Sequence, residues 1–178
     1  MSSLNFDPLV EQYDETRVVD SDNLVAAVRW LAERYPPTEY PQLLEPGIGT
    51  GRIAIPLAEC GYSVRGVDIS QRMLAALADH LAEQGTPLRV SGQLADVQRL
   101  PFPSASFNII VAVHLFYFMQ EWKLAVDELL RVLRPDCPMV LMHTGMGMEI
   151  PFVNDYYKEY CAQQGFRVSS LGVSSTER

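Results

Sequence analysis

Apolar residues along the chain fall into two patterns: short continuous runs, and longer stretches in which they recur every three or four positions. A short apolar run bounded by turn residues predicts a strand, and a wholly apolar run predicts a strand that is covered on both faces. The run over residues 108–113 is almost wholly apolar. The six predicted strands cover residues 42–45, 63–68, 88–90, 108–113, 139–143 and 166–170.

Helical spacing fills the intervals between these runs. Pro36, Gly61, Gly85, Pro135 and Gly165 each follow such a stretch and predict where a helix ends. The predicted helices are one that carries Leu24, Val28 and Leu31, and others over residues 52–60, 70–84, 121–133 and 154–164.

Strands that alternate with helices indicate an α/β domain, a doubly wound and mostly parallel sheet with helices on both faces. We predict one domain over residues 1–178. Its parts are an N-terminal lid and helices over 1–40, a ligand-binding core over 41–144, and a C-terminal helix and edge strand over 145–178.

Composition narrows the possible partners. The 178 residues carry a net charge of −8, and a diffuse negative field repels phosphate backbones, so no nucleic acid partner is expected. The three cysteines, Cys60, Cys137 and Cys161, lack metal-ligand spacing, so we expect no metal site, reduced thiols and a cytoplasmic location. The longest apolar run, residues 109–119, is shorter than the ~20 residues of a membrane span, so no membrane partner is expected.

The segment Glu45-Pro46-Gly47-Ile48-Gly49-Thr50-Gly51 has the composition of a ligand-binding loop. Glycine tolerates positive φ and has no Cβ, so a loop with three alternate glycines can turn sharply and let a ligand lie against its backbone. The next helix directs its free N–H groups at the same place. Asp68 ends the following strand, where a carboxylate can accept both hydrogen bonds of a ribose diol.

The dinucleotide-binding fingerprint is the nearest alternative for this loop. That fingerprint requires Gly-x-Gly-x-x-Gly/Ala, and Arg52 stands at its last position here. The loop therefore does not match a pyrophosphate site, which disfavours a nicotinamide-dependent oxidoreductase.

Four motifs together resemble those of the class I S-adenosylmethionine-dependent methyltransferases, over roughly residues 42–142. The segment from Glu45 to Gly51 resembles motif I of this family. Val67-Asp68-Ile69-Ser70 with Met73-Leu74 resembles the acidic second motif, and Asp96-Val97 with Leu100-Pro101-Phe102 resembles the adenine-binding loop. The stretch from Glu128 to Pro135 resembles the helix before the fifth strand. The resemblance implies a Rossmann-like sheet, S-adenosylmethionine as cofactor, and methyl transfer to a small-molecule acceptor.

The resemblance also implies roles for individual residues. Glu45 would orient the glycine loop or the amino group of the methionine moiety, and Gly47, Gly49 and Gly51 would let that moiety approach the backbone. Asp68 would hold the ribose hydroxyls. The remaining cofactor contacts would come from Ile69 and Met73 on the adenine face, Asp96 and Val97 at the adenine edge, the Ala112 carbonyl at the methionine ammonium, and Tyr13 and Arg17 in an N-terminal lid.

The acceptor site is expected where the fourth and fifth strands end. His114, Tyr117 and His143 are the candidate substrate-binding residues there, and no catalytic residue is assigned, because a histidine at a strand end is more often only hydrogen-bonded. A general base is needed only when the acceptor carries a proton of high pKa.

The C-terminal part is shorter than the resemblance requires. The family sheet has seven strands, and only about one strand of sequence follows Phe166. Either the sheet is abbreviated or the sequence lacks its natural C-terminus, and an open sheet edge would allow homodimerisation. A cofactor-binding protein without methyl-transfer activity is the other possibility, because part of the acceptor site would then be missing.

Overall fold

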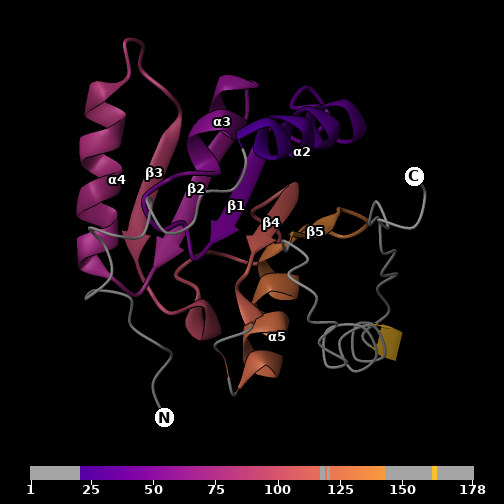
Figure 1. Ribbon diagram of the computed structural model, residues 1–178. Helices are drawn as coiled ribbons and strands as arrows, with labels where there is room; N and C mark the ends of the chain where they lie inside the picture. Colours follow the sequence, from indigo (N-terminus) through magenta and orange to yellow (C-terminus); the bar gives the residue numbers. More distant parts are fainter. Residues whose placement is uncertain (1–20, 117–118, 120, 143–161, 164–178) are drawn as a thin grey trace. The chain divides into compact units, whose positions relative to one another are not determined.

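The computed structural model describes residues 21–116, 119, 121–142 and 162–163. Two compact units divide the chain, Met1–His143 and Thr144–Arg178, and the elements below belong to the first. Its centre is a five-stranded parallel sheet in the order β3-β2-β1-β4-β5 (Figure 1). The strands are β1 Gln42–Pro46, β2 Ser63–Asp68, β3 Val90–Leu94, β4 Ile109–Val113 and β5 Met139–Met142.

Helices follow the strands as the sequence predicts. They are α2 Ser21–Arg34, α3 Ala54–Glu59, α4 Gln71–Glu83, the short 3-10 helix η2 Val97–Arg99, and α5 Trp122–Val132. The alternation of strands and helices around a parallel sheet confirms the doubly wound α/β architecture.

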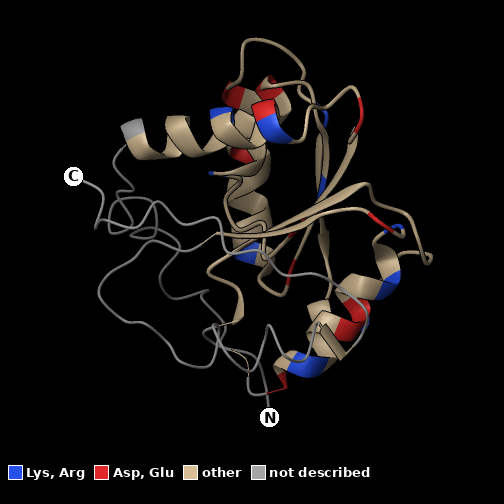
Figure 2. Cartoon of the chain, turned by 90° about the vertical axis from the view of Figure 1, so that its right-hand side faces the viewer, with Lys and Arg blue, Asp and Glu red and all other residues tan. Residues whose placement is uncertain are grey.

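The core has one layer on each face of the sheet, because successive side chains of a strand point to opposite faces. Leu43, Val64 and Ile109 pack in one cluster with residues of α2, α3 and α4. Leu44 and Ile110, their neighbours along the strands, are also fully buried. Figure 2 shows α5 on the side of the sheet opposite α2, and interspersed acidic and basic residues on the helices and loops.

Two predicted boundaries were wrong. The third strand runs over Val90–Leu94 and not over 88–90, because pairing with β2 from Val64↔Val90 to Asp68↔Leu94 sets its position, while its residues 91–94 are exposed and mostly polar. The helix after the glycine loop starts at Ala54 and not at Arg52. The predicted sixth strand and most of the last predicted helix lie outside the described residues, apart from 162–163, which are helical.

The turn before β5 is formed without glycine, by Pro135, Asp136 and Cys137. Asp136 takes a left-handed φ of +61°, and the Cys137 N–H donates to the Arg134 carbonyl at 3.2 Å. Aspartate tolerates this region better than most residues, so a Pro-Asp pair can form the turn.

Candidate functional site

The site lies where the two halves of the sheet separate. β1 and β2 are paired along all of β1, from Gln42↔Ser63 to Pro46↔Val67. The ladder between β1 and β4 stops at Leu44↔Ile110, although β1 continues to Pro46 and β4 to Val113. Connections leave in opposite directions at this switch point, which is where ligands bind in open α/β sheets.

The glycine loop begins at the carboxyl end of β1. Gly47, Gly49 and Gly51 all have left-handed φ values, of +72°, +55° and +86°. The Gly47 N–H and the Ile48 N–H both donate to the Val67 carbonyl, at 2.8 and 3.0 Å, so the loop folds back over the end of β2. Its shape therefore depends on glycine at alternate positions, as the sequence predicts.

The environments of Gly49 and Gly51 differ. A Cβ on Gly49 would meet no atom of the described residues within 4 Å, although Gly49 itself is buried. A Cβ on Gly51 would lie 2.3 Å from Leu77 Cδ1 and 3.4 Å from Ile55 Cδ1. Gly49 therefore faces free space at the site, whereas Gly51 allows α3 and α4 to pack closely.

Asp68 fastens the loop to the end of β2. Its Oδ2 accepts a hydrogen bond from the Gly49 N–H at 2.9 Å, and its Oδ1 accepts one from the Ser70 N–H at 2.8 Å. A carboxylate offers about four lone-pair sites, so one that binds backbone N–H groups can also accept hydrogen bonds from a ligand hydroxyl. Sequence reasoning missed that Asp68 holds the glycine loop, because this role depends on a hydrogen bond between residues nineteen positions apart.

Glu45 is a buried acid at the end of β1. Only 2% of it is exposed, and its buried Oε2 has no hydrogen-bond partner among the described residues. Burial raises the pKa of the Glu45 carboxyl well above its usual value, while the positive charge of Arg52 lowers that pKa and the negative charge of Asp68 raises it. An unsatisfied buried carboxyl is unfavourable in the ligand-free protein, so it is well suited to accept a hydrogen bond from a bound donor or water.

We expect Glu45→Gln to change the pH dependence of stability. With a raised pKa the native state binds the proton more tightly than the unfolded state, so the free energy of unfolding falls as pH rises from the unfolded-state pKa of about 4.3 towards the native pKa. The variant should melt at the same temperature as the parent near pH 4.5. Near pH 8 the variant should melt at a higher temperature than the parent. The difference should be about 2–4 °C for each kcal/mol of unfolding free energy that the parent loses by ionising Glu45.

Melting curves of both proteins at several pH values measure this difference. Glu83→Gln, which removes one charge from an exposed position on α4, is the matched control. A constant difference between Glu45→Gln and the parent at all pH values would contradict the raised pKa.

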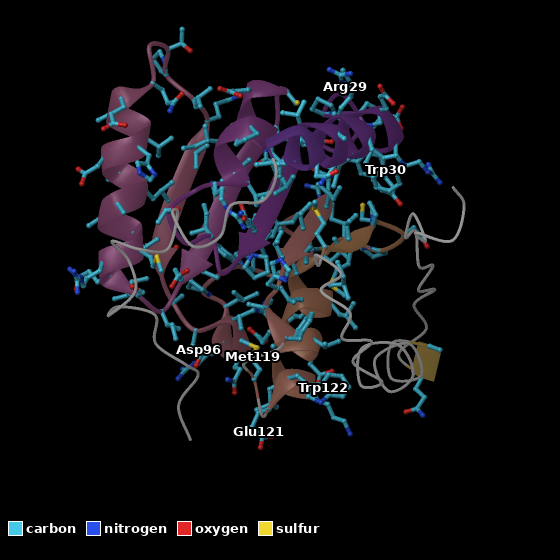
Figure 3. The ribbon with its side chains drawn as sticks, viewed as in Figure 1. Arg29, Trp30, Asp96, Met119, Glu121 and Trp122 are labelled. Carbon is cyan, nitrogen blue, oxygen red and sulfur yellow. The ribbon has the colours of Figure 1, made fainter. Side chains whose placement is uncertain are left out.

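Asp96 lies on the segment after β3, at the carboxyl end of the sheet (Figure 3). Its Oδ1 accepts a hydrogen bond from the Gln98 N–H at 2.9 Å, so it caps η2, and its side chain is exposed. Val97 is buried. Of the two residues predicted for the adenine face, Ile69 is 36% exposed, and Met73 is almost fully buried on α4. The ligand contacts of these four residues stay predictions.

Ala112 and His114 lie at the end of β4. Ala112 is buried and opposite Leu141 of β5. His114 has a left-handed φ of +50°, uncommon for a residue other than glycine, and its N–H donates to the Met142 carbonyl at 3.0 Å. Leu115 Cδ1 lies 3.2 Å from the position of a Cβ on Gly47, so the segment after β4 reaches the glycine loop. The other predicted site residues, Tyr13, Arg17, Tyr117 and His143, lie outside the described residues.

Sequence reasoning missed two sets of contacts around the site. His80 on α4 places its Nδ1 3.0 Å from the Thr50 carbonyl in the glycine loop. Glu128 and Arg131 on α5 hold the segment after Asp96, and their spacing of three along a helix was the available indication that they pair.

The sequence predicts no metal site and no membrane span, and the structure can be searched for both only over the described residues. No cluster of three or more histidine, cysteine, aspartate or glutamate side chains suited to a metal ion occurs among the described residues. Within those same ranges, each helix is too short or too polar to cross a membrane.

The chain is similar to known proteins in sequence and in fold. The family model described as "Methyltransferase domain" matches residues 44–141. The phosphatidylethanolamine N-methyltransferase of Cereibacter sphaeroides is 33% identical over 103 residues, which cover 57% of this chain and 50% of that protein. The 27-O-demethylrifamycin SV methyltransferase of Amycolatopsis mediterranei is 32% identical over 95 residues, or 53% of this chain and 35% of that protein.

Among solved structures, a SAM-dependent methyltransferase from Aquifex aeolicus superposes with a TM-score of 0.71 and 17% identity. The match covers 92% of this chain and 89% of that one, and at this identity it shows the fold alone. The chain spans half or less of the length of the two curated relatives.

Proposed function

Because the chain belongs to the methyltransferase-domain family, matched over residues 44–141, we propose that it binds S-adenosylmethionine and transfers its methyl group to a small-molecule acceptor. The observation that carries this proposal is the glycine loop. Its three glycines are left-handed, the Gly49 N–H donates to Asp68, and a Cβ on Gly49 would meet no atom of the described residues within 4 Å.

The residues around the loop fit the parts of the cofactor. The Asp68 carboxylate, which ends β2 next to the exposed Ile69 side chain, can accept hydrogen bonds from the ribose hydroxyls. The unpartnered Oε2 of Glu45 can accept a hydrogen bond from the methionine ammonium or from a water bound to it. Asp96 is exposed at the same edge and can accept one from the adenine amino group.

The protein's contribution to methyl transfer is alignment and exclusion of water. When bound, S-adenosylmethionine supplies a methyl group on a sulfonium sulfur, and that group reacts by direct displacement. The glycine loop and Asp68 hold the donor side at the switch point. The segment after β4, with the strained backbone at His114, lies beside the loop, where it can orient the acceptor.

Calorimetric titration with S-adenosylhomocysteine tests the cofactor assignment, with NAD as the comparison ligand. We expect S-adenosylhomocysteine to bind, and at a hundredfold excess over its Kd to stabilise the protein by about 2.7 kcal/mol, a rise in melting temperature of roughly 5–10 °C. NAD should have no effect. Binding of NAD without binding of S-adenosylhomocysteine would instead support the oxidoreductase alternative.

Substitution of Asp68 should weaken binding through the ribose. Asp68→Ala removes an acceptor of charge-assisted hydrogen bonds, so we expect a loss of roughly 1.5–3 kcal/mol in binding. The melting temperature of the free protein should also fall, because the Gly49 and Ser70 N–H groups lose their acceptor.

An analogue of S-adenosylhomocysteine that lacks the ribose 2′-hydroxyl separates these two effects. The parent protein should bind this analogue more weakly than S-adenosylhomocysteine, and Asp68→Ala should bind both equally. If the variant still prefers the ligand with the hydroxyl, Asp68 is not the ribose acceptor.

The acceptor, the oligomeric state and the location are finer parts of the proposal. The names of the two relatives refer to phosphatidylethanolamine and to 27-O-demethylrifamycin SV. These names support a small-molecule acceptor without identifying it. β5 forms one outer edge of the described sheet, where it pairs only with β4, and this supports a homodimer formed through an open edge, testable by light scattering. The free cysteines Cys60 and Cys137 are consistent with a cytoplasmic location.

A further inference from the structure

Two side chains of α5 hold the backbone of the segment that follows η2. The Leu100 N–H donates to Glu128 Oε2 at 2.7 Å. Arg131 donates to the Phe102 carbonyl at 2.8 Å through Nη1 and to the Leu100 carbonyl at 3.1 Å through Nη2. These three bonds tie residues 100–102 to α5 across about thirty positions of the chain.

The same two side chains also pair with each other. Arg131 Nε lies 2.7 Å from Glu128 Oε1, and Arg131 Nη2 lies 2.8 Å from Glu128 Oε2, which is a bidentate geometry. The hydrogen bond from Arg131 lowers the pKa of the Glu128 carboxyl, so Glu128 is ionised at neutral pH. The side chains are 22% exposed for Glu128 and 34% for Arg131. Bidentate pairing fixes the orientation of the guanidinium, and this fixes where Leu100 and Phe102 can lie.

The other end of this segment is anchored at β2. The Ala95 N–H donates to the Asp68 carbonyl at 3.0 Å. Between the anchors, Asp96 caps η2 by accepting hydrogen bonds from the Gln98 N–H through its side chain and from the Arg99 N–H through its carbonyl. Asp96 thus lies on a short bridge that runs from the end of β2 to α5.

We propose that the Glu128–Arg131 pair is a positioning device for adenine recognition, because it sets the place of Asp96 relative to Asp68. This inference rests on the proposed cofactor function. Asp96 itself is exposed, and the hydrogen bonds at the two ends of the bridge join its segment to β2 and to α5. If the α5 end is loosened, the Asp96 carboxylate and the Val97 N–H lose their fixed distance from the ribose site.

Discrimination between two ligands tests the proposal more directly than affinity alone. The probes are S-adenosylhomocysteine and S-inosylhomocysteine. In the second ligand a carbonyl oxygen replaces the adenine amino group, which is the group expected to donate a hydrogen bond to Asp96. The variants are Glu128→Gln and Arg131→Lys, which keep side-chain size but remove the bidentate pair. Glu121→Gln is the matched control on the same helix, because Glu121 is exposed and makes no capping hydrogen bond with its side chain.

We expect the parent and Glu121→Gln to prefer the adenosyl ligand by roughly tenfold or more in Kd, as a site built around a hydrogen bond does. Glu128→Gln and Arg131→Lys should bind S-adenosylhomocysteine roughly tenfold more weakly, with the preference reduced towards one. The ratio of the two Kd values does not change when part of the sample is unfolded, so a merely structural role would leave it unaltered.

The possible failures are distinguishable. A parent that binds neither ligand would overturn the proposed function. A parent that binds both equally would show that Asp96 does not read the amino group, and would overturn this inference while leaving the cofactor assignment standing. Variants that keep the full preference would show that the pair does not position Asp96. Glu128→Gln and Arg131→Lys test the proposal independently. If one of them folds poorly, the ligand preference of the other still tests it.

Discussion

Gly49→Ala should lose S-adenosylhomocysteine binding by at least roughly tenfold, or about 1.4 kcal/mol, while the protein still folds. The added methyl group would point into a space where no atom of the described residues lies within 4 Å, and where we propose that the cofactor passes the backbone. Folding should suffer less. A φ of +55° costs alanine about 1–2 kcal/mol, a fall in melting temperature of a few degrees.

Melting temperature and calorimetric affinity of Gly49→Ala should be measured on one preparation. A variant that binds S-adenosylhomocysteine as tightly as the parent would remove Gly49 from the cofactor site. A variant that does not fold would show that the glycine serves only the turn.

Gly51→Ala should have the opposite outcome, with stability as the main loss. Its Cβ would lie 2.3 Å from Leu77 Cδ1, at a backbone φ of +86°. Leu77 is 2% exposed, and its other methyl carbon lies 2.8 Å from the position of a Cβ on Gly92, so the side chain has little room to rotate. Overpacking costs typically 1–3 kcal/mol and the backbone strain about 1–2 more. We expect the melting temperature to fall by roughly 5–15 °C.

A double-mutant cycle separates the contact from the strain. In a Leu77→Ala background the clash is removed, so Gly51→Ala should cost less there than in the parent. Equal costs in both backgrounds would show that the packing of Leu77 against Gly51 does not limit substitution, and that the φ value alone does.

The glycine loop shows which features local sequence predicts and which it does not. Three glycines at alternate positions after an apolar run predict a sharp loop with positive φ, and all three have it. The same pattern does not distinguish Gly49 from Gly51. The difference comes from Leu77 and Ile55, which pack against one glycine and not against the other.

The strands also show that local sequence predicts some features of the fold and not others. The bounds of β2 are those that the sequence predicts, because the buried apolar residues Val64 and Val67 lie between Gly61, which follows the preceding helix, and Ser70, which caps the next one. β3 was misplaced. Its residues are mostly exposed, so no buried face marks it in the sequence, and its register is set by hydrogen bonds to β2.

The sequence by itself determined the alternation of strands and helices, the glycine loop, and the carboxylates Glu45, Asp68 and Asp96 near the strand ends, because these follow from periodicity and local backbone preference. Only the tertiary structure decided that Asp68 holds Gly49, that Glu45 is buried without a partner at Oε2, and that Glu128 holds Leu100. Each of these depends on which distant segments the packed sheet and helices bring within about 3 Å, or on what they exclude from a buried oxygen. Local propensities contain no such information, because a hydrogen bond between residues far apart in sequence exists only once the layers between them are packed.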